Sequence, residues 1–154
     1  MTQLRHLIIV LGDQLDLDAS AFDGFDAARD AVWMAEAAEE STHVWSSQPR
    51  IAIFLSAMRH FAQALRDAGR PLHYQALDEG PATLAAALQA AIAQHEPYAL
   101  VMTAPGDARV LASLRAVAQQ AGLALDIRED RHFFSAVHEF AAYAKGRKQL
   151  RMEY

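Results

Sequence analysis

The apolar residues of this chain form two alternating kinds of segment, short apolar-rich runs and longer stretches with helical spacing. The short runs are residues 4–11, 31–35, 72–77, 98–103 and 123–127. The first of them, LRHLIIVL, shows no regular polar alternation, which is typical of a strand that is covered on both faces. We expect five strands at these positions, of which 31–35 is the weaker prediction.

The stretches between the later runs have the spacing of amphipathic helices. Residues 50–69 are the clearest case, because their apolar positions recur at steps of three and four: Ile51, Phe54, Leu55, Met58, Phe61, Ala62 and Leu65. Ser47 can cap this helix, Pro49 suits its first turn, and Gly69 ends it. Residues 81–94 and 107–120 predict two further helices, and residues 137–144 have a helix-like pattern.

This alternation of strand and helix predicts an α/β domain with a parallel sheet and helices on both faces. The acidic segment 13–30 reads as a long loop with a helical turn. Ligands of such sheets bind beyond the carboxyl ends of the strands, near the point where the strand order reverses. The candidate loops are therefore residues 12–15, 36–42 and 103–107.

Composition narrows the function classes. The 154 residues fit one domain, and no apolar run approaches the ~20 residues that span a bilayer. No signal peptide is recognisable, so we expect a cytoplasmic protein. Cysteine is absent, which excludes disulfides and cysteine-ligated metal or iron–sulfur sites within these residues. A net charge of -5 argues against nucleic-acid binding by the chain as a whole.

Four features of the sequence suggest a chemical role, but each is also explained by ordinary loop or surface structure. Asp16 and Asp18 imitate a phosphotransfer motif but follow the first strand too late, so a solvated loop is preferred. The seven histidines show no metal-ligand spacing, and we predict no metal site. The row Ser56, Arg59, His60 and Gln63 beside the apolar stripe, and the basic cluster 145–151, each fit either solvated surface or docking.

Several strings together resemble one family. They are GDQL at 12–15, SAMRHFA at 56–62, EDRHFF at 129–134, EF at 139–140 and GRKQLRMEY at 146–154. Together they resemble the amino-terminal α/β domain of the deoxyribodipyrimidine photolyase-related proteins, the bacterial cryptochrome/photolyase branch with an iron–sulfur cluster. The resemblance covers the whole chain.

The resemblance implies a Rossmann-like, three-layer domain whose five-stranded parallel sheet has the order 3-2-1-4-5. Residues 1–144 would be this antenna-type domain, and residues 145–154 would begin the connector to a helical domain that is absent here. That absent domain is expected to hold FAD and the iron–sulfur cluster and to contact DNA. We accordingly expect no catalytic residue and no photolyase activity in these 154 residues alone, and no membrane partner.

The resemblance also implies an antenna chromophore, 6,7-dimethyl-8-ribityllumazine, in the crevice at the strand ends. Its candidate ligands are the residues of the candidate loops and of the long helix: Gly12, Asp13, Glu36, Glu40, Phe54, Pro105, Gly106 and Asp107. Carboxylates suit the hydrogen-bond donors of a pteridine-like ring and a ribityl chain, and glycine lets a flat ring approach.

Two alternatives stay open. The domain could serve assembly only, docking its Arg59 and His60 face and its basic tail on the FAD-binding domain without a chromophore. Less favoured is magnesium-dependent phosphotransfer through Asp16 and Asp18. The whole protein would act either in light-dependent DNA repair or in blue-light sensing.

Overall fold

The computed structural model describes residues 3–39 and 46–150 of the chain. Its centre is a parallel sheet of five strands, which are β1 (His6–Ile9), β2 (Asp30–Ala35), β3 (Leu72–Gln75), β4 (Ala99–Thr103) and β5 (Ala124–Arg128). Their order across the sheet is β3-β2-β1-β4-β5, and every neighbouring pair is parallel. The predicted fold class and strand order are therefore confirmed.

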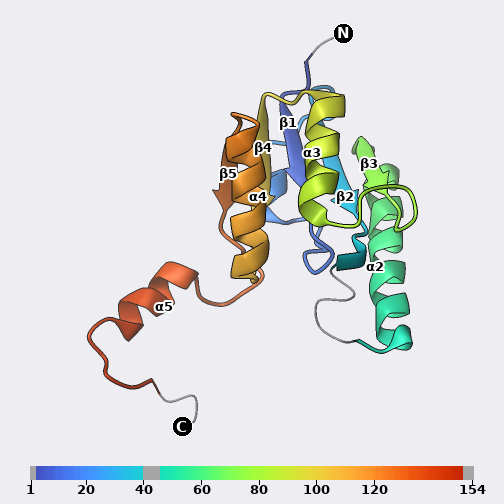
Figure 1. Cartoon of the computed structure of the whole chain (residues 1–154). Helices are drawn as coiled ribbons and strands as arrows, with labels where there is room; N and C mark the ends of the chain where they lie inside the picture. Colours follow the sequence, from blue (N-terminus) through green and yellow to red (C-terminus); the bar gives the residue numbers. More distant parts are fainter. Residues whose placement is uncertain (1–2, 40–45, 151–154) are drawn as a thin grey trace.

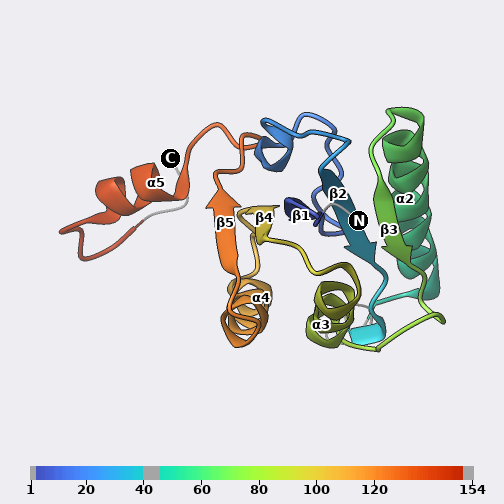
Figure 2. The ribbon, with the colours of Figure 1, turned by 90° about the horizontal axis from the view of Figure 1, so that it is seen from above.

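Helices cover both faces of this sheet (Figures 1 and 2). Helices α3 (Leu84–His95) and α4 (Ala108–Gln120) lie on one face, and α2 (Gln48–Asp67) lies on the other. A short 3-10 helix, η1 (Ser20–Phe22), is the helical turn expected within the acidic segment. Helix α5 (Val137–Ala144) lies away from the sheet.

The core has two apolar layers because successive strand residues face opposite sides. Leu7 and Ile9 face α3 and α4, whereas Ile8 and Val10 face α2. All four side chains are buried, as are all six residues of β2. The apolar runs of β1, β2 and β4 are thus explained by strands that are covered on both faces, whereas the edge strand β5 exposes Ala124 and Asp126 on one face.

Local sequence sets where the helices begin and end. Asp107 caps α4 by accepting hydrogen bonds from the amides of Arg109 and Val110, and Thr83 caps α3 in the same manner. The predicted helix 81–94 therefore begins only at Leu84. Ser47 holds the N-cap position of α2, but its side chain makes no capping hydrogen bond.

The apolar stripe of α2 is buried only in its carboxyl-terminal half. Met58, Phe61, Ala62 and Leu65 are buried against the sheet, whereas Phe54 is 40% exposed. The helix ends as expected, because Gly69 adopts a φ of 70° that closes the last turn.

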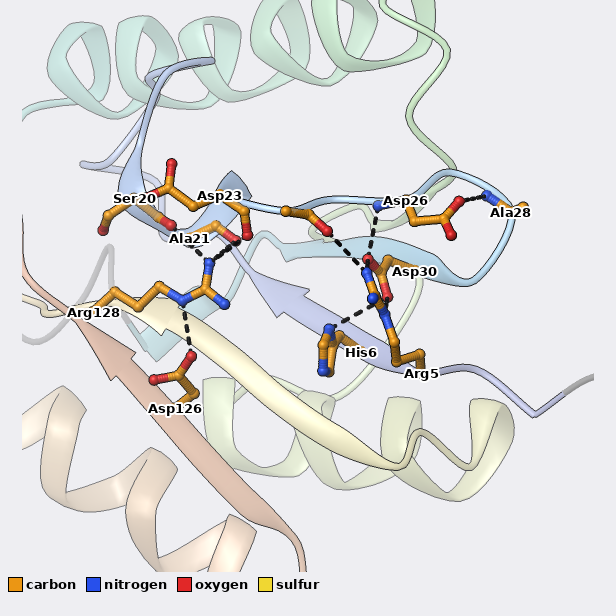
Figure 3. Close-up of polar contacts among 11 residues, drawn as sticks. Arg5, His6, Ser20, Ala21, Asp23, Asp26, Ala28, Asp30, Asp126 and Arg128 are labelled. Atoms are coloured by element: carbon orange, nitrogen blue, oxygen red, sulfur yellow. Dashed lines mark hydrogen bonds and ion pairs between the residues drawn. The ribbon is translucent and has the colours of Figure 1, made fainter.

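Polar contacts fix the amino-terminal side of the sheet (Figure 3). The buried carboxylate of Asp30 accepts hydrogen bonds from the Arg5 side chain and from the Asp26 amide, and His6 lies 3.4 Å away. Burial raises the pKa of Asp30, but these hydrogen bonds and the nearby positive charges outweigh it and leave the pKa below its ordinary value. Asp30 is therefore an ionised carboxylate held inside the fold.

No helix of the described residues is long and apolar enough to cross a bilayer.

We predict that Leu114→Ala lowers the free energy of unfolding by about 2–5 kcal/mol, because this α4 side chain is fully buried between helix and sheet. Urea unfolding measures the change. The matched control is Leu150→Ala, whose side chain is 42% exposed and should cost less than about 1 kcal/mol. Equal losses in both variants would contradict the packing of α4 on the sheet.

Candidate functional site

A cavity of about 220 Å³ lies at the carboxyl ends of β1, β2 and β4, where the candidate loops meet. Its lining residues come from the three loops and from helices α2, α3 and α4: Val10, Leu11, Gly12, Asp13, Ala35, Glu36, Ala37, Phe54, Leu55, Met58, Leu84, Pro105, Asp107 and Val110. The walls are mostly apolar, and the carboxylates are few. This is the composition expected of a small-molecule pocket.

Most of the site residues expected from the sequence line this one cavity: Gly12, Asp13, Glu36, Phe54, Pro105 and Asp107. Gly106 lies beside it and borders two neighbouring hollows instead. Glu40 lies outside the described residues. The structure thus brings the first group together, and their role in binding a ligand stays a prediction.

Gly12 is placed where no side chain fits. A Cβ atom there would lie 2.6 Å from Cζ of Phe54 and 2.8 Å from Sδ of Met58. Both distances are below the closest approach of carbon to such atoms, so a larger residue would push α2 side chains out of the cavity wall. Glycine therefore serves close packing at this position.

Gln14 ties two of the loops together. Its Nε2 donates a hydrogen bond to the backbone oxygen of Ala104 at 3.0 Å and a weaker one to that of Thr103 at 3.4 Å. Its Oε1 is buried and accepts no hydrogen bond from any described residue. The GDQL string thus combines a close contact at Gly12 with a clamp between the β1 and β4 loops.

Glu36 is the most strongly held group of the cavity. It follows β2 directly, and its carboxylate is fully buried. Oε1 accepts from Nε of Arg59 at 2.7 Å and from the Tyr74 hydroxyl, while Oε2 accepts from Nη2 of Arg59 at 2.9 Å and from the Leu77 amide at 3.0 Å. The Arg59 pair is bidentate, the strongest arrangement for these two groups.

These contacts fix the charge of the site. The hydrogen bonds from Arg59 do most to hold the pKa of Glu36 below its ordinary value, helped by Tyr74 and Leu77, and they outweigh the opposing effect of burial. Burial and the neighbouring Glu36 anion raise the pKa of Tyr74. Glu36 is therefore ionised and Tyr74 keeps its proton at neutral pH.

The four carboxylates expected in the site differ in whether they can still accept a hydrogen bond from a ligand. Glu36 already accepts four hydrogen bonds, and Asp107 caps α4 and pairs with Arg109. Asp13 is exposed and accepts no hydrogen bond from a described residue, so its oxygens are available at the rim. Of the expected carboxylates within the described residues, Asp13 is thus the free acceptor.

Arg59 is the site residue whose role the sequence did not reveal. The sequence leaves solvated surface and docking open for Arg59 and its helical row, and in the structure the Arg59 guanidinium is paired with Glu36. A signal was present, because a carboxylate after a buried strand needs a cationic partner. Neither the spacing nor the helical pattern could say which of the arginines it was.

The remaining motifs show no site of their own. Oδ1 of Asp16 accepts the amide of Asp18, a local turn that aspartate often makes. Among residues 3–39 and 46–150, no three His, Cys, Asp or Glu side chains converge as metal ligands.

Comparison with known proteins gives two matches. The family model described as deoxyribodipyrimidine photo-lyase-related protein matches residues 8–154. A protein of Agrobacterium fabrum named (6-4) photolyase is 36% identical over 153 residues, which are 98% of this chain. The chain spans only 30% of that relative's length.

We predict that Glu36→Gln lowers the free energy of unfolding at pH 7 by about 2 kcal/mol, since an amide cannot accept all four hydrogen bonds and leaves Arg59 without its counter-charge. Urea unfolding measures this. Exposed Glu96→Gln is the control and should change little.

Comparison of the wild type with the Glu36→Gln variant also gives a prediction on the pH dependence of stability. The pKa of Glu36 is lower in the folded state than its unfolded value of about 4.3, so its contribution is present above that value and is lost as the pH falls through the folded pKa. The stability difference between wild type and Glu36→Gln should therefore shrink below about pH 4. A difference that grows with acidification would contradict an ionised Glu36.

Proposed function

Because the chain belongs to the family of deoxyribodipyrimidine photo-lyase-related proteins, we propose that it acts as the antenna-type α/β domain of a light-dependent flavoprotein. The whole protein would serve DNA repair or blue-light sensing, and the relative named (6-4) photolyase supports repair as the role. The proposal assigns no catalytic residue to these 154 residues.

The observation that carries the proposal is the cavity at the strand ends. It is largely apolar, it is bordered by the closely packed Gly12 and Phe54, and it has the free carboxylate of Asp13 at its rim. A flat heteroaromatic ring suits such walls, and ring N–H or ribityl hydroxyl groups suit a carboxylate. These features support 6,7-dimethyl-8-ribityllumazine as the ligand.

The size of the cavity limits how this ligand would fit. A volume of about 220 Å³ is below the ~300 Å³ at which drug-sized pockets begin, so the ring would occupy the cavity and the ribityl chain would extend to the rim. The bound lumazine would absorb light and pass the excitation to a flavin. This chain's part would be to orient the ring against Phe54 and to exclude water from it.

FAD and an iron–sulfur cluster would lie outside this chain. The sequence contains no cysteine, so it has no thiolate to ligate a cluster. The FAD-binding helical domain would be a partner in a longer polypeptide, and DNA would be contacted by that whole protein. The flavin performs the chemistry in such enzymes, so we expect no repair by this domain alone.

A second candidate function is assembly without a chromophore. The observation that favours it is helix α5, which has no buried residue and carries exposed aromatic side chains. Docking through Arg59 has less support, because its guanidinium is already paired with Glu36.

We predict saturable binding when the purified 154-residue protein is titrated with 6,7-dimethyl-8-ribityllumazine and ligand fluorescence is followed. Phe54→Ala removes a wall of the cavity and Gly12→Ala displaces that wall, so each should weaken binding about tenfold, or ~1.4 kcal/mol.

The control for this titration is Ile53→Ala, the neighbour of Phe54 on α2, which is 71% exposed and does not line the cavity. Its affinity should equal that of the wild type. No saturable fluorescence change with the wild-type protein would sink the chromophore proposal and leave the assembly function standing.

A further inference from the structure

The segment after β5 holds most of the large apolar side chains that are exposed in the described chain. Of the ten large apolar side chains that are exposed, six lie between residues 133 and 150: Phe133, Phe134, Val137, Phe140, Tyr143 and Leu150. Helix α5 carries three of these and has no buried residue. We call residues 133–150 the aromatic arm. Figures 1 and 2 show α5 standing clear of the sheet and of α4.

The arm does not fold back over the face of β5 that lies opposite α4. Leu125 and Ile127 of β5 pack toward α4, so Ala124, Asp126 and Arg128 face the other side of the sheet. That side is polar and already occupied.

Arg128 holds the segment around η1 against this side of β5 (Figure 3). Its Nε pairs with Asp126 at 2.8 Å, and its Nη1 donates to the backbone oxygens of Ser20 and Asp23 at 2.9 and 2.8 Å. The segment around η1 therefore covers the place beside β5 where a helix following this strand would otherwise pack. An arm with this many exposed large apolar side chains marks an interaction surface.

The charge of the arm distinguishes it from the rest of the chain. Residues 133–150 carry Lys145, Arg147 and Lys148 and one acidic residue, Glu139, a charge of +2. Residues 1–132 hold 10 basic and 17 acidic residues, a charge of -7. A nucleic acid would be repelled by the body that presents the arm, whereas an apolar protein surface with an acidic rim would match it.

The relative indicates where such a surface would come from. The match with the Agrobacterium protein covers 153 residues, so it includes the arm, yet it makes up 30% of that protein. The relative is thus more than three times as long as the matched segment. A large further polypeptide is present there beside the counterpart of the arm.

We propose that the aromatic arm is the docking surface for a second domain of a longer polypeptide, which presents an apolar groove with acidic side chains at its rim. The arm would insert Phe140 and its aromatic neighbours into the groove and set its lysines and arginine on the rim. The second domain is taken from the proposed function, whereas docking of the arm does not require that the domain binds a chromophore.

Hydrogen exchange read by mass spectrometry tests the proposal. The 154-residue protein is compared with a chimera in which it replaces the matched segment of the Agrobacterium relative. Amides of α5 should exchange fast in the 154-residue protein, because none of the helix residues is buried, and at least about tenfold more slowly in the chimera.

Substitutions tie the effect to the arm. Phe140→Ser should abolish the slow exchange in the chimera while leaving the melting temperature and lumazine affinity of the 154-residue protein unchanged. Tyr98→Ser is the matched control, because this aromatic side chain is 73% exposed but lies outside the arm. It should change neither exchange nor stability.

Two outcomes would overturn the proposal. Equal exchange of α5 in both proteins would show that nothing docks on the arm. Slow exchange in the 154-residue protein that is lost on dilution, with a dimer in sedimentation, would show that a second copy is the occupant. If the chimera is insoluble, the unaltered relative decides, since fast exchange in its own matching segment would refute docking. Failure of lumazine binding alone would leave this test unaffected.

Discussion

Three central strands are buried on both faces, and this constraint decides where the polar groups of the domain can lie. Within β1, β2 and β4 nearly every side chain packs against a helix or a neighbouring strand, so charged groups are confined to the strand ends. Strand β2 shows the consequence most clearly. It begins at the buried Asp30 and is followed by the buried Glu36, and each carboxylate is held by an arginine. The two ion pairs thus lie at opposite ends of β2.

The two ends serve different purposes because their surroundings differ. At the amino-terminal end, Asp30 binds Arg5, which directly precedes the neighbouring strand β1, and the turn at Asp26, so the pair joins chain segments that already lie side by side. At the carboxyl end, Glu36 lines the cavity and is held by Arg59 on α2 and by Leu77 beyond β3, so these contacts fix one part of the cavity wall. A carboxylate that already accepts four hydrogen bonds is a poor recognition group for a ligand. It is well suited to keeping the walls of a pocket in place.

Much of this arrangement could be predicted from the sequence, and the remainder depends on contacts across the chain. The apolar runs located the strands, since double-sided burial leaves no polar alternation, and the parallel topology then located the cavity at residues 12–15, 36–42 and 103–107. The strand order required the family resemblance, because periodicity carries no information on which strands are neighbours. The pairing of Glu36 with Arg59 joins positions 23 residues apart on different elements, so no local pattern could reveal it. The contact of Arg128 with the chain near η1 was equally hidden, because it joins residues 108 positions apart.

Four residues of the string SAMRHFA now have a physical explanation. Met58 lies against Gly12, where a Cβ would come within 2.8 Å of the Met58 sulfur, so the β1 loop approaches α2 this closely because residue 12 has no side chain. Arg59, the next residue, points about 100° away around the helix and reaches Glu36. Phe61 and Ala62 return to the sheet face and are buried in the core. One and a half turns of helix therefore meet a glycine, a carboxylate and the sheet at once, and a change of register by one residue would lose all three. Such a segment is constrained by geometry at several points even though none of its side chains needs to take part in chemistry.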